Sequence, residues 1–258
     1  MNKTRLLNLG CGNRYHKDWV NADIRSSSRE VLALDLTKQL PFEDESFYIV
    51  YHSHLLEHFP NHFAQYFLTE CFRILESGGI LRVVVPDFER MARIYLELLA
   101  RSLEGNEIAQ KQYEWIMLEM FDQMVRNQSG GEMLKYWQQN PMPAEDFVIE
   151  RVGSEVLDVI KILRNAPMNS ESTAKQKESD DPGKIGTFRV AGEVHQWMYD
   201  RFSLKCLLEK AGFVAIKQCR ADESSIPDFN SYLLDIEKDG SVRKPDSLFM
   251  EAVKPHSA

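Results

Sequence analysis

The chain has 258 residues, 43% of them hydrophobic and 27% charged, and a net charge of −8. These values are ordinary for a globular protein, and the length allows one or two domains with a sizeable core. The negative charge and the lack of a basic run argue against nucleic-acid binding, which requires clustered Lys and Arg.

The first predicted strand starts by Arg5 and ends in the segment Gly10-Cys11-Gly12. Gly10 and Gly12 have no Cβ, so the backbone can turn sharply and let a ligand approach closely. A second short apolar run ends in Asp23, whose carboxylate can accept hydrogen bonds from ribose hydroxyls. This layout indicates a nucleoside site, although the third glycine of the dinucleotide fingerprint is missing.

Three more predicted strands follow at residues 31–36, 47–52 and 79–86, the first ending in Asp35-Leu36 and the last stopped by proline. A helix is predicted to begin within residues 53–59 and to end at the glycine pair of residues 77–79.

The order of these elements resembles the class I S-adenosylmethionine-dependent methyltransferases. The resemblance covers about residues 1–90 and 190–255. The matching residues are Asn8-Leu-Gly-Cys-Gly12, Asp23, Asp35-Leu36, Leu40-Pro41-Phe42 with Phe47, Leu56-Glu57-His58, Arg73-Ile74-Leu75 before Gly78-Gly79, and residues 195–200 and 207–213.

The resemblance implies an α/β fold with a doubly wound, mostly parallel seven-stranded sheet. The residues between its two matching parts have helical periodicity, which predicts a helical insertion after strand five. Residues 1–87 and 193–258 would form the cofactor-binding domain, and residues 88–192 the insertion. Residues 212–219 and 247–253 are its sixth and seventh strands, with the seventh antiparallel beside the fifth.

The resemblance also implies S-adenosylmethionine as cofactor. Asp23 would hold the ribose, Asp35-Leu36 would lie beside the adenine, and His52 and Ser53 would face the methionine part. The full set of candidate cofactor residues is Asn8, Gly10, Cys11, Gly12, Asp23, Ile24, Asp35, Leu36, His52, Ser53 and His58.

Several positions depart from the family pattern. Asn8 replaces an acid that often holds the methionine amino group, and Tyr48 replaces an aspartate of strand four. Residues 13–18 can hold little more than one helical turn, so the helix after strand one should be vestigial. This trimmed form resembles a subgroup of predicted methyltransferases found among envelope-polysaccharide enzymes.

The middle of the chain has helical periodicity over residues 88–103, 107–126 and 144–165, the last broken near Gly153, and residues 168–186 suggest a mobile loop. The aromatic and methionine side chains of these helices suit core packing. They also suit a cap over the acceptor site, because no covering segment precedes strand one and methyl transfer requires a site that excludes water.

The segment His54-Leu-Leu-Glu57-His58 matches H-x-x-E-H, in which two imidazoles on one helix hold zinc. The methyltransferase pattern supplies Leu-Glu-His here without a catalytic metal, so we expect no metal.

Two residues are candidate catalytic bases. His195 precedes a predicted helix at residues 201–211 and could take a proton from a hydroxyl as the methyl group arrives, or could simply order the chain there. Asp87 follows strand five and could be a base, a ligand for a polar acceptor, or a cap for the next helix.

The cysteines Cys11, Cys71, Cys206 and Cys219 lie far apart and form no C-x-x-C motif, which predicts reduced thiols. A strand starting by Arg5 leaves no room for a signal peptide, and no apolar stretch approaches the roughly 18 residues of a membrane span. We expect a cytoplasmic enzyme without integral membrane association that methylates a small, lipid-like or sugar-like acceptor, at oxygen. Its oligomeric state stays open.

Two alternatives stay open at this point. A nicotinamide-dependent oxidoreductase would share the glycine turn and the acid, but should have a fuller G-x-G-x-x-G and a longer first helix. A non-catalytic S-adenosylmethionine-binding or interaction protein could keep the fold, given Asn8 and Tyr48.

Overall fold

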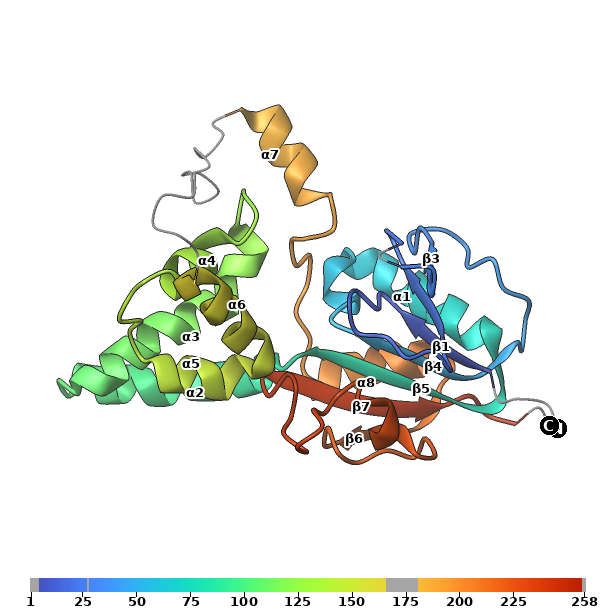
Figure 1. Ribbon diagram of the computed structural model, residues 1–258. Coiled ribbons are helices and arrows are strands. Elements are labelled where there is room, and N and C mark those ends of the chain that lie inside the picture. The colour runs from blue at the N-terminus through green and yellow to red at the C-terminus, as the bar shows by residue number, and fades with distance from the viewer. Residues whose placement is uncertain (1–4, 27, 166–180, 257–258) are drawn as a thin grey trace. The chain divides into compact units, whose positions relative to one another are not determined.

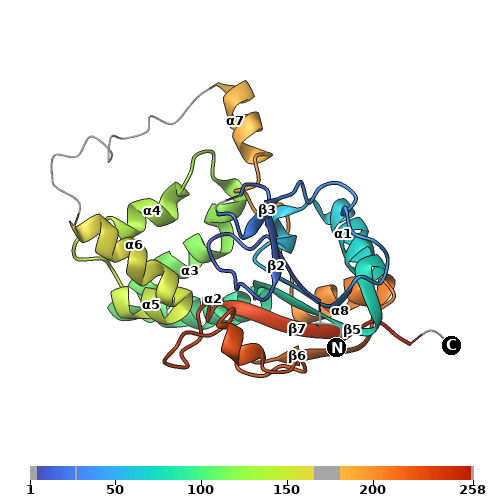
Figure 2. The ribbon, with the colours of Figure 1, turned by 45° about the vertical axis from the view of Figure 1, so that its right-hand side comes forward.

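In the computed structural model, which describes residues 5–26, 28–165 and 181–256, seven strands form a single sheet. Their order is β3-β2-β1-β4-β5-β7-β6, seen from two directions in Figure 1 and Figure 2. The strands are β1 (Leu6–Leu9), β2 (Val20–Asp23), β3 (Val31–Ala33), β4 (Phe47–Ser53), β5 (Leu75–Pro86), β6 (Val214–Cys219) and β7 (Ser247–Val253). The predicted α/β fold with a seven-stranded sheet is confirmed, and the sheet is mixed.

Strands β1 to β5 run parallel wherever they pair, and β7 pairs antiparallel with both β5 and β6. The register aligns Leu9 of β1 with Ala22 of β2 and with His52 of β4. The carboxyl ends of these three strands therefore meet at one edge, which is where open α/β sheets bind ligands. The antiparallel pairing of β7 with β5 agrees with the prediction.

The chain divides into two compact units. The first, here called the sheet unit, consists of Met1–Asp87, Trp197–Val242 and Ser247–Ala258. The second, the helical unit, consists of Phe88–Gln196 and Arg243–Asp246.

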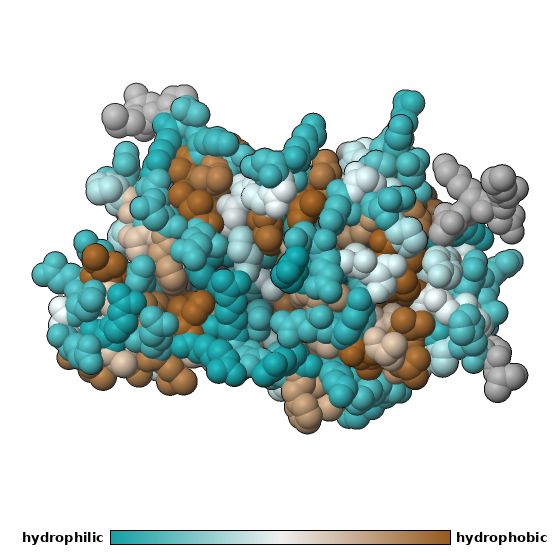
Figure 3. Space-filling view, turned by 90° about the horizontal axis from the view of Figure 1, so that it is seen from below, coloured by the Kyte–Doolittle hydropathy of each residue, from teal (hydrophilic) through white to brown (hydrophobic). Residues whose placement is uncertain are grey.

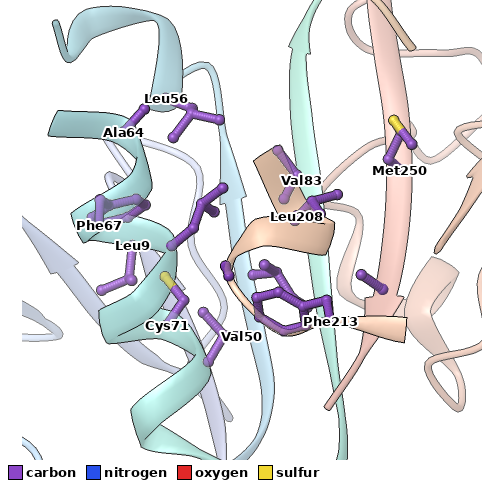
Figure 4. Packing of buried hydrophobic residues seen from close by; sticks show 14 of the residues in the cluster. Leu9, Val50, Leu56, Ala64, Phe67, Cys71, Val83, Leu208, Phe213 and Met250 are labelled. Atoms are coloured by element: carbon purple, nitrogen blue, oxygen red, sulfur yellow. The ribbon is translucent and has the colours of Figure 1, made fainter. Parts of the chain in front are cut away.

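One face of the sheet packs against α1 (Asn61–Ile74) and α8 (Arg201–Lys210). The buried residues of α1 recur at three- and four-residue spacing, so one stripe of this helix faces the strands. Figure 4 shows Phe67 of α1, Leu208 of α8 and Val83 of β5 in this cluster. Removal of these apolar side chains from water stabilises the layer.

The opposite face of the sheet is covered by residues 220–242, here called the β6–β7 connection, which contains the short 3-10 helix η3 (Phe229–Tyr232). Aromatic side chains dominate this layer: Trp19 and Tyr51 pack edge-on or tilted against Phe229. A loop with a small aromatic core thus covers this face of the sheet, as helices α1 and α8 cover the other.

Arg82 of β5 lies within this second layer and is wholly buried. Its Nε donates to Asp235 at 2.7 Å, and Nη1 donates to Glu251 of β7, its partner in the strand register, at 2.8 Å. The remaining guanidinium hydrogen bonds go to the carbonyls of Glu223, Arg220 and Ala221. Arg82 therefore ties the β6–β7 connection to the middle of the sheet.

The helical unit contains, among its described residues, α2 (Phe88–Leu103), α3 (Glu107–Val125), α4 (Gly131–Trp137), α5 (Glu145–Val152), α6 (Ser154–Asn165) and α7 (Pro182–Arg189). The bounds of α2 are those predicted, α3 ends one residue earlier, and Gly153 separates α5 from α6 as predicted. Trp115 and Ile116 of α3 are fully buried, as core packing requires, whereas Ile108 is exposed.

Two helices of this unit were not predicted. Helix α4 starts at the second residue of a glycine pair, with Gly130 at φ +78° as its N-cap. Helix α7 includes residues 182–186 of the predicted loop, where the capping aspartate Asp181 and Pro182 in the first turn form a helix start signal. Residues 168–180 of that predicted loop lie outside the described residues.

The predicted helix between strands four and five was wrong at both ends. It begins only after Pro60, preceded by the separate 3-10 turn η1 (Leu56–His58), and it ends at Ile74. The segment from Leu75 to Gly79 belongs to β5, where Leu75 pairs with Phe47 of β4. The glycine pair therefore marks an irregular stretch of strand rather than a helix end, a frequent use of glycine in sheets.

None of the helices in the described part of the chain has the length and apolar composition of a membrane span. On the face of the molecule in Figure 3, hydrophilic residues separate the apolar patches.

We expect Arg82→Met to destabilise the protein strongly, because Asp235 and Glu251 would remain buried without their cation. Breaking a buried pair in this way costs about 3–5 kcal/mol. Urea unfolding followed by circular dichroism measures the loss. The control is Arg220→Met, whose side chain pairs with Asp222 at the surface and should leave the stability nearly unchanged. Equal small losses in both variants would contradict the role assigned to Arg82.

Candidate cofactor site

The glycine turn follows β1 at the ligand-binding edge of the sheet. The N–H groups of Gly10 and Cys11 both donate to the carbonyl of Ala22, at 2.8 and 3.2 Å. Gly10 has a φ of +66° and lies so close to Leu55 that an added Cβ would come within 2.9 Å of that side chain. Gly12 has a φ of +52°, and a Cβ there would meet no described atom within 4 Å. The turn is thus packed on the side of Gly10 and open beside Gly12.

Asp23 closes the turn from the end of β2. One carboxylate oxygen accepts a hydrogen bond of 2.9 Å from the N–H of Gly12, and the other accepts a longer one, 3.4 Å, from Arg25. A carboxylate has about four lone-pair sites, so Asp23 keeps acceptor capacity for ribose hydroxyls. Ile24, the next residue, has an exposed side chain.

Cys11 lies inside the turn and is buried. Burial, together with the nearby carboxylate of Asp23, raises the pKa of its thiol to about 11. Because a neutral thiol is a weak nucleophile, Cys11 contributes packing rather than covalent chemistry.

Asn8, near the end of β1, makes hydrogen bonds within the sheet unit. Its side chain is buried, and its amide donates to the carbonyl of Arg14 at 3.1 Å and to Asn21 at 3.3 Å. The amide of Asn21 in turn donates to the carbonyls of His16 and Trp19. The two asparagines thus satisfy backbone groups of residues 10–19, all described, which contain turns but no helix, as the short spacing predicted.

Asp35 and Leu36 follow β3. One carboxylate oxygen of Asp35 accepts hydrogen bonds from the N–H and the hydroxyl of Thr37, at 3.0 and 2.6 Å, and Lys38 lies 3.1 Å from the other. The hydrogen bonds from Thr37, with help from Lys38, lower the pKa of Asp35. Leu36 is buried in the core on the α1 face. The carboxylate of Asp35 therefore organises its own turn in this structure.

His52 and Ser53 end β4 on opposite faces of the sheet. The His52 ring is wholly buried, with its edge toward Phe67 at a centroid distance of 5.3 Å, and its ring nitrogens have no hydrogen-bond partner among the described residues. Burial lowers the pKa of His52 to about 3, so the ring is neutral. Ser53 hydrogen-bonds the phenol of Tyr51 in the other layer. The side chain of His52 thus lies in the core, whereas that of Ser53 is half-buried.

The H-x-x-E-H segment does not form the helix that the zinc motif requires. His54 has a φ of +50° and precedes η1, whereas His58 is its last residue. The ring of His54 instead contacts the hydroxyl of Ser247 at 2.7 Å and lies 3.5 Å from the buried carboxylate of Glu57. His54 and His58 are therefore not on one helix face.

The two candidate bases belong to different units. Asp87 ends the first segment of the sheet unit and forms a backbone bridge with Tyr199. His195, in the helical unit, is buried; its N–H donates to the carbonyl of Gln123, and its Nε2 lies 3.1 Å from the Gln123 amide nitrogen. An amide N–H can only donate, so that contact leaves the proton of a neutral His195 on Nδ1.

Three residues near the glycine turn were missed by the sequence analysis: Arg14, Asn21 and Leu55. Asn21 had a visible signal, because it is a polar residue in the middle of a short apolar strand. Leu55 had none, since its contact with Gly10 depends on how distant segments pair.

The residues of the turn fit S-adenosylmethionine, the cofactor that the resemblance implies. Gly12 leaves space for a ligand, Asp23 retains acceptor capacity at the adjoining strand end, and Ile24 offers an exposed apolar side chain beside it. Ribose hydroxyls with an adjoining base require this combination of an acceptor and an apolar surface.

Comparison with known proteins identifies a domain in this part of the chain. Residues 14–83 match a family model described as a methyltransferase domain. The match includes Asp23, Asp35 and His58 and begins two residues after Gly12. No curated protein matches the chain.

The solved structures that the chain matches include methyltransferases. A SAM-dependent methyltransferase from Archaeoglobus fulgidus has 12% identity over 97% of this chain and 86% of its own, with a TM-score of 0.41. A Haemonchus contortus phosphoethanolamine N-methyltransferase, in complex with S-adenosylhomocysteine, has 10% identity over 98% of this chain and 49% of its own, with a TM-score of 0.39. Because both TM-scores are below 0.5, the domain assignment rests on residues 14–83.

We expect His52→Phe to change how stability depends on pH. The pKa of His52 is about 3 in the folded protein and 6.5 when unperturbed, so below pH 6.5 the unfolded chain takes up a proton that the folded protein does not. The wild-type free energy of unfolding therefore falls as the pH drops from 6.5 toward 3. Between pH 7 and pH 5 the variant should gain about 2 kcal/mol relative to the wild type.

Urea unfolding at several pH values measures the difference in free energy of unfolding between wild type and variant. All other titrating groups are present in both proteins, so their contributions cancel in this difference. The control is His62→Gln, which alters an exposed histidine. A difference between wild type and His52→Phe that stays constant with pH would show that His52 is not held neutral by burial.

Proposed function

We propose that the chain is an S-adenosylmethionine-dependent methyltransferase that methylates a small, lipid-like or sugar-like acceptor at oxygen. The observation that carries this proposal is the glycine turn closed on Asp23, with open space beside Gly12. A backbone turn with an acceptor carboxylate beside it suits a nucleoside ligand.

In this proposal Asp23 accepts hydrogen bonds from the ribose, and the backbone from Gly10 to Gly12 lies against the methionine part. Asp35 and Leu36 lie beside the adenine, and His58 and Ile24 belong to the same site. His52 and Asn8, whose side chains are buried, support this site from the core.

S-adenosylmethionine, when bound, supplies an electrophilic methyl group on a positively charged sulfur. An acceptor hydroxyl oxygen must then bond to the methyl carbon opposite the carbon–sulfur bond that breaks, and must lose its proton. Asp87 and His195 are the candidate bases for that proton. Asp87 lies at the end of β5, on the edge where β1, β2 and β4 also end, which favours a carboxylate at the acceptor.

We propose further that residues 88–192, together with His195, bind the acceptor. This segment follows β5 directly, so it begins at the ligand-binding edge of the sheet. Its core contains Trp115, Met133, Tyr136 and Met142. Aromatic and methionine side chains suit an adaptable apolar pocket, which favours a small or lipid-like molecule over a macromolecule.

The nicotinamide-dependent alternative is disfavoured by the connection between β1 and β2. Dinucleotide-binding folds place the pyrophosphate at the N-terminus of the helix that follows strand one. Residues 10–19 contain no helix, so that anion site is missing from this described segment. Non-catalytic binding of S-adenosylmethionine is the remaining alternative, and only turnover separates it from an enzyme. A panel of hydroxylated lipid-like and sugar-like compounds, tested with labelled methyl donor and read by mass, provides that test.

We expect Asp23→Ala to weaken the binding of S-adenosylhomocysteine at least about tenfold, because two ribose hydroxyls lose a partner worth about 1–3 kcal/mol. Isothermal titration calorimetry measures the affinity. Asp18→Ala is the matched control, since Asp18 is an exposed carboxylate in the same connection. Asp23→Asn should lose less, because its amide oxygen can still accept from Gly12. Unchanged affinity in Asp23→Ala would remove Asp23 from the site.

Replacement of residues 88–192 by a short linker should abolish methyl transfer yet leave S-adenosylhomocysteine binding measurable, because Gly12, Asp23 and Asp35 lie outside the segment. Calorimetry and the mass-based assay measure the two properties. Introduction of Asp23→Ala into the deletion variant is the control that ties any remaining binding to the same site. Normal methyl transfer by a folded deletion variant would contradict an acceptor-binding role for the segment.

A further inference from the structure

Arg14, in the connection between β1 and β2, is held by the β6–β7 connection. Its Nε donates to the carbonyl of Leu233 at 2.7 Å, and one terminal nitrogen donates to the carbonyl of Ile236 at 3.2 Å. The same nitrogen forms an ion pair of 2.8 Å with Glu237. Both charged side chains are more than two-thirds buried, so this contact is shielded from much of the solvent. Three bonds from one planar guanidinium define its position and orientation.

The segment that accepts these bonds is itself anchored in the sheet. Asp235, between the two acceptor carbonyls, accepts 2.6 Å from the hydroxyl of Tyr51 and 2.7 Å from Arg82. The ring of Tyr232 packs edge-on against His16 and Trp19, which belong to the same connection as Arg14. Arg14 is thus attached to a segment that is itself hydrogen-bonded to the sheet.

The backbone of Arg14 also belongs to the glycine turn. Its N–H donates to the carbonyl of Cys11 at 2.9 Å, and its carbonyl accepts from the amide of Asn8 at 3.1 Å. Gly12 lies between Cys11 and Arg14 in the sequence, within the turn that their hydrogen bond closes, and its N–H donates to Asp23. Displacement of Arg14 would therefore displace the part of the turn that opens toward the ligand.

We propose that Arg14 is a positioning residue for the methyl donor: its guanidinium fixes the glycine turn to the β6–β7 connection. The proposal rests on the function proposed above. Its physical reason is the missing crossover helix, since residues 10–19 have no intrahelical hydrogen bonds to keep them in place. A turn that is ordered before the ligand arrives avoids the entropy cost of ordering it on binding.

Calorimetry with S-adenosylhomocysteine, on the full chain, tests this role. Arg14→Met should raise the dissociation constant about tenfold while the far-UV circular dichroism stays that of the wild type. Arg14→Lys should recover only part of the affinity, because an ammonium group can pair with Glu237 but cannot also serve both carbonyls. Glu237→Gln keeps the two bonds from Arg14 to the carbonyls and should therefore weaken binding less than Arg14→Met. It replaces Arg14→Met as the test if Arg14→Met does not fold.

In the methyl-transfer assay, Arg14→Met should raise KM for the donor and leave kcat at saturating donor nearly unchanged, a split that general loss of folded protein would not produce. The matched control is Arg220→Met, which removes an exposed guanidinium from the β6–β7 connection. Wild-type affinity in folded Arg14→Met and Glu237→Gln would overturn the role of Arg14 and leave the proposed function intact. Absence of S-adenosylhomocysteine binding by the wild-type protein would overturn both.

Discussion

The sheet unit depends on one buried cation. Arg82 uses its guanidinium donors on two carboxylates and three carbonyls, and the rings of Phe229 and Phe249 lie over it at 4.6 and 5.6 Å. An unpaired charge in this position would be costly, but a fully hydrogen-bonded one specifies a single arrangement of the groups around it. The parallel strands of the sheet must be covered on both faces. On one face the cover is a loop, the β6–β7 connection, and Arg82 holds this loop against the strands.

The same layer determines the geometry of the ligand-binding edge. Because the connection between β1 and β2 is too short for a helix, the side chains of Asn8 and Asn21 hydrogen-bond its backbone carbonyls. The side chain of Arg14 holds the same connection to carbonyls of the β6–β7 connection. Two of the departures from the family pattern, Asn8 and the missing helix after strand one, are therefore related. An acid in place of Asn8 could not donate to the carbonyl of Arg14, so the amide suits a chain that lacks the crossover helix.

The candidate site residues divide according to how local their roles are. Gly10, Gly12 and Asp23 lie where a strand–turn–strand pattern puts them, since positive φ values and a strand-end carboxylate follow from a few adjacent residues. His52 illustrates the opposite case. Its position at the end of β4 suggested contact with a ligand, yet its ring lies in the core against Phe67 because α1 packs on that side of the strand.

The sequence by itself determined the order and type of most elements, including β1, β2 and α2, the break at Gly153, and the turn that closes on Asp23. These features depend on hydrophobic periodicity and on glycine, which act within a few residues. Only the tertiary structure decided that Arg82 meets Asp235, that Asn8 supports the turn, and that Leu75 belongs to a strand. Those outcomes depend on segments far apart in the chain, whose pairing no local pattern encodes, because a side chain's partners are set by the packing of the whole sheet.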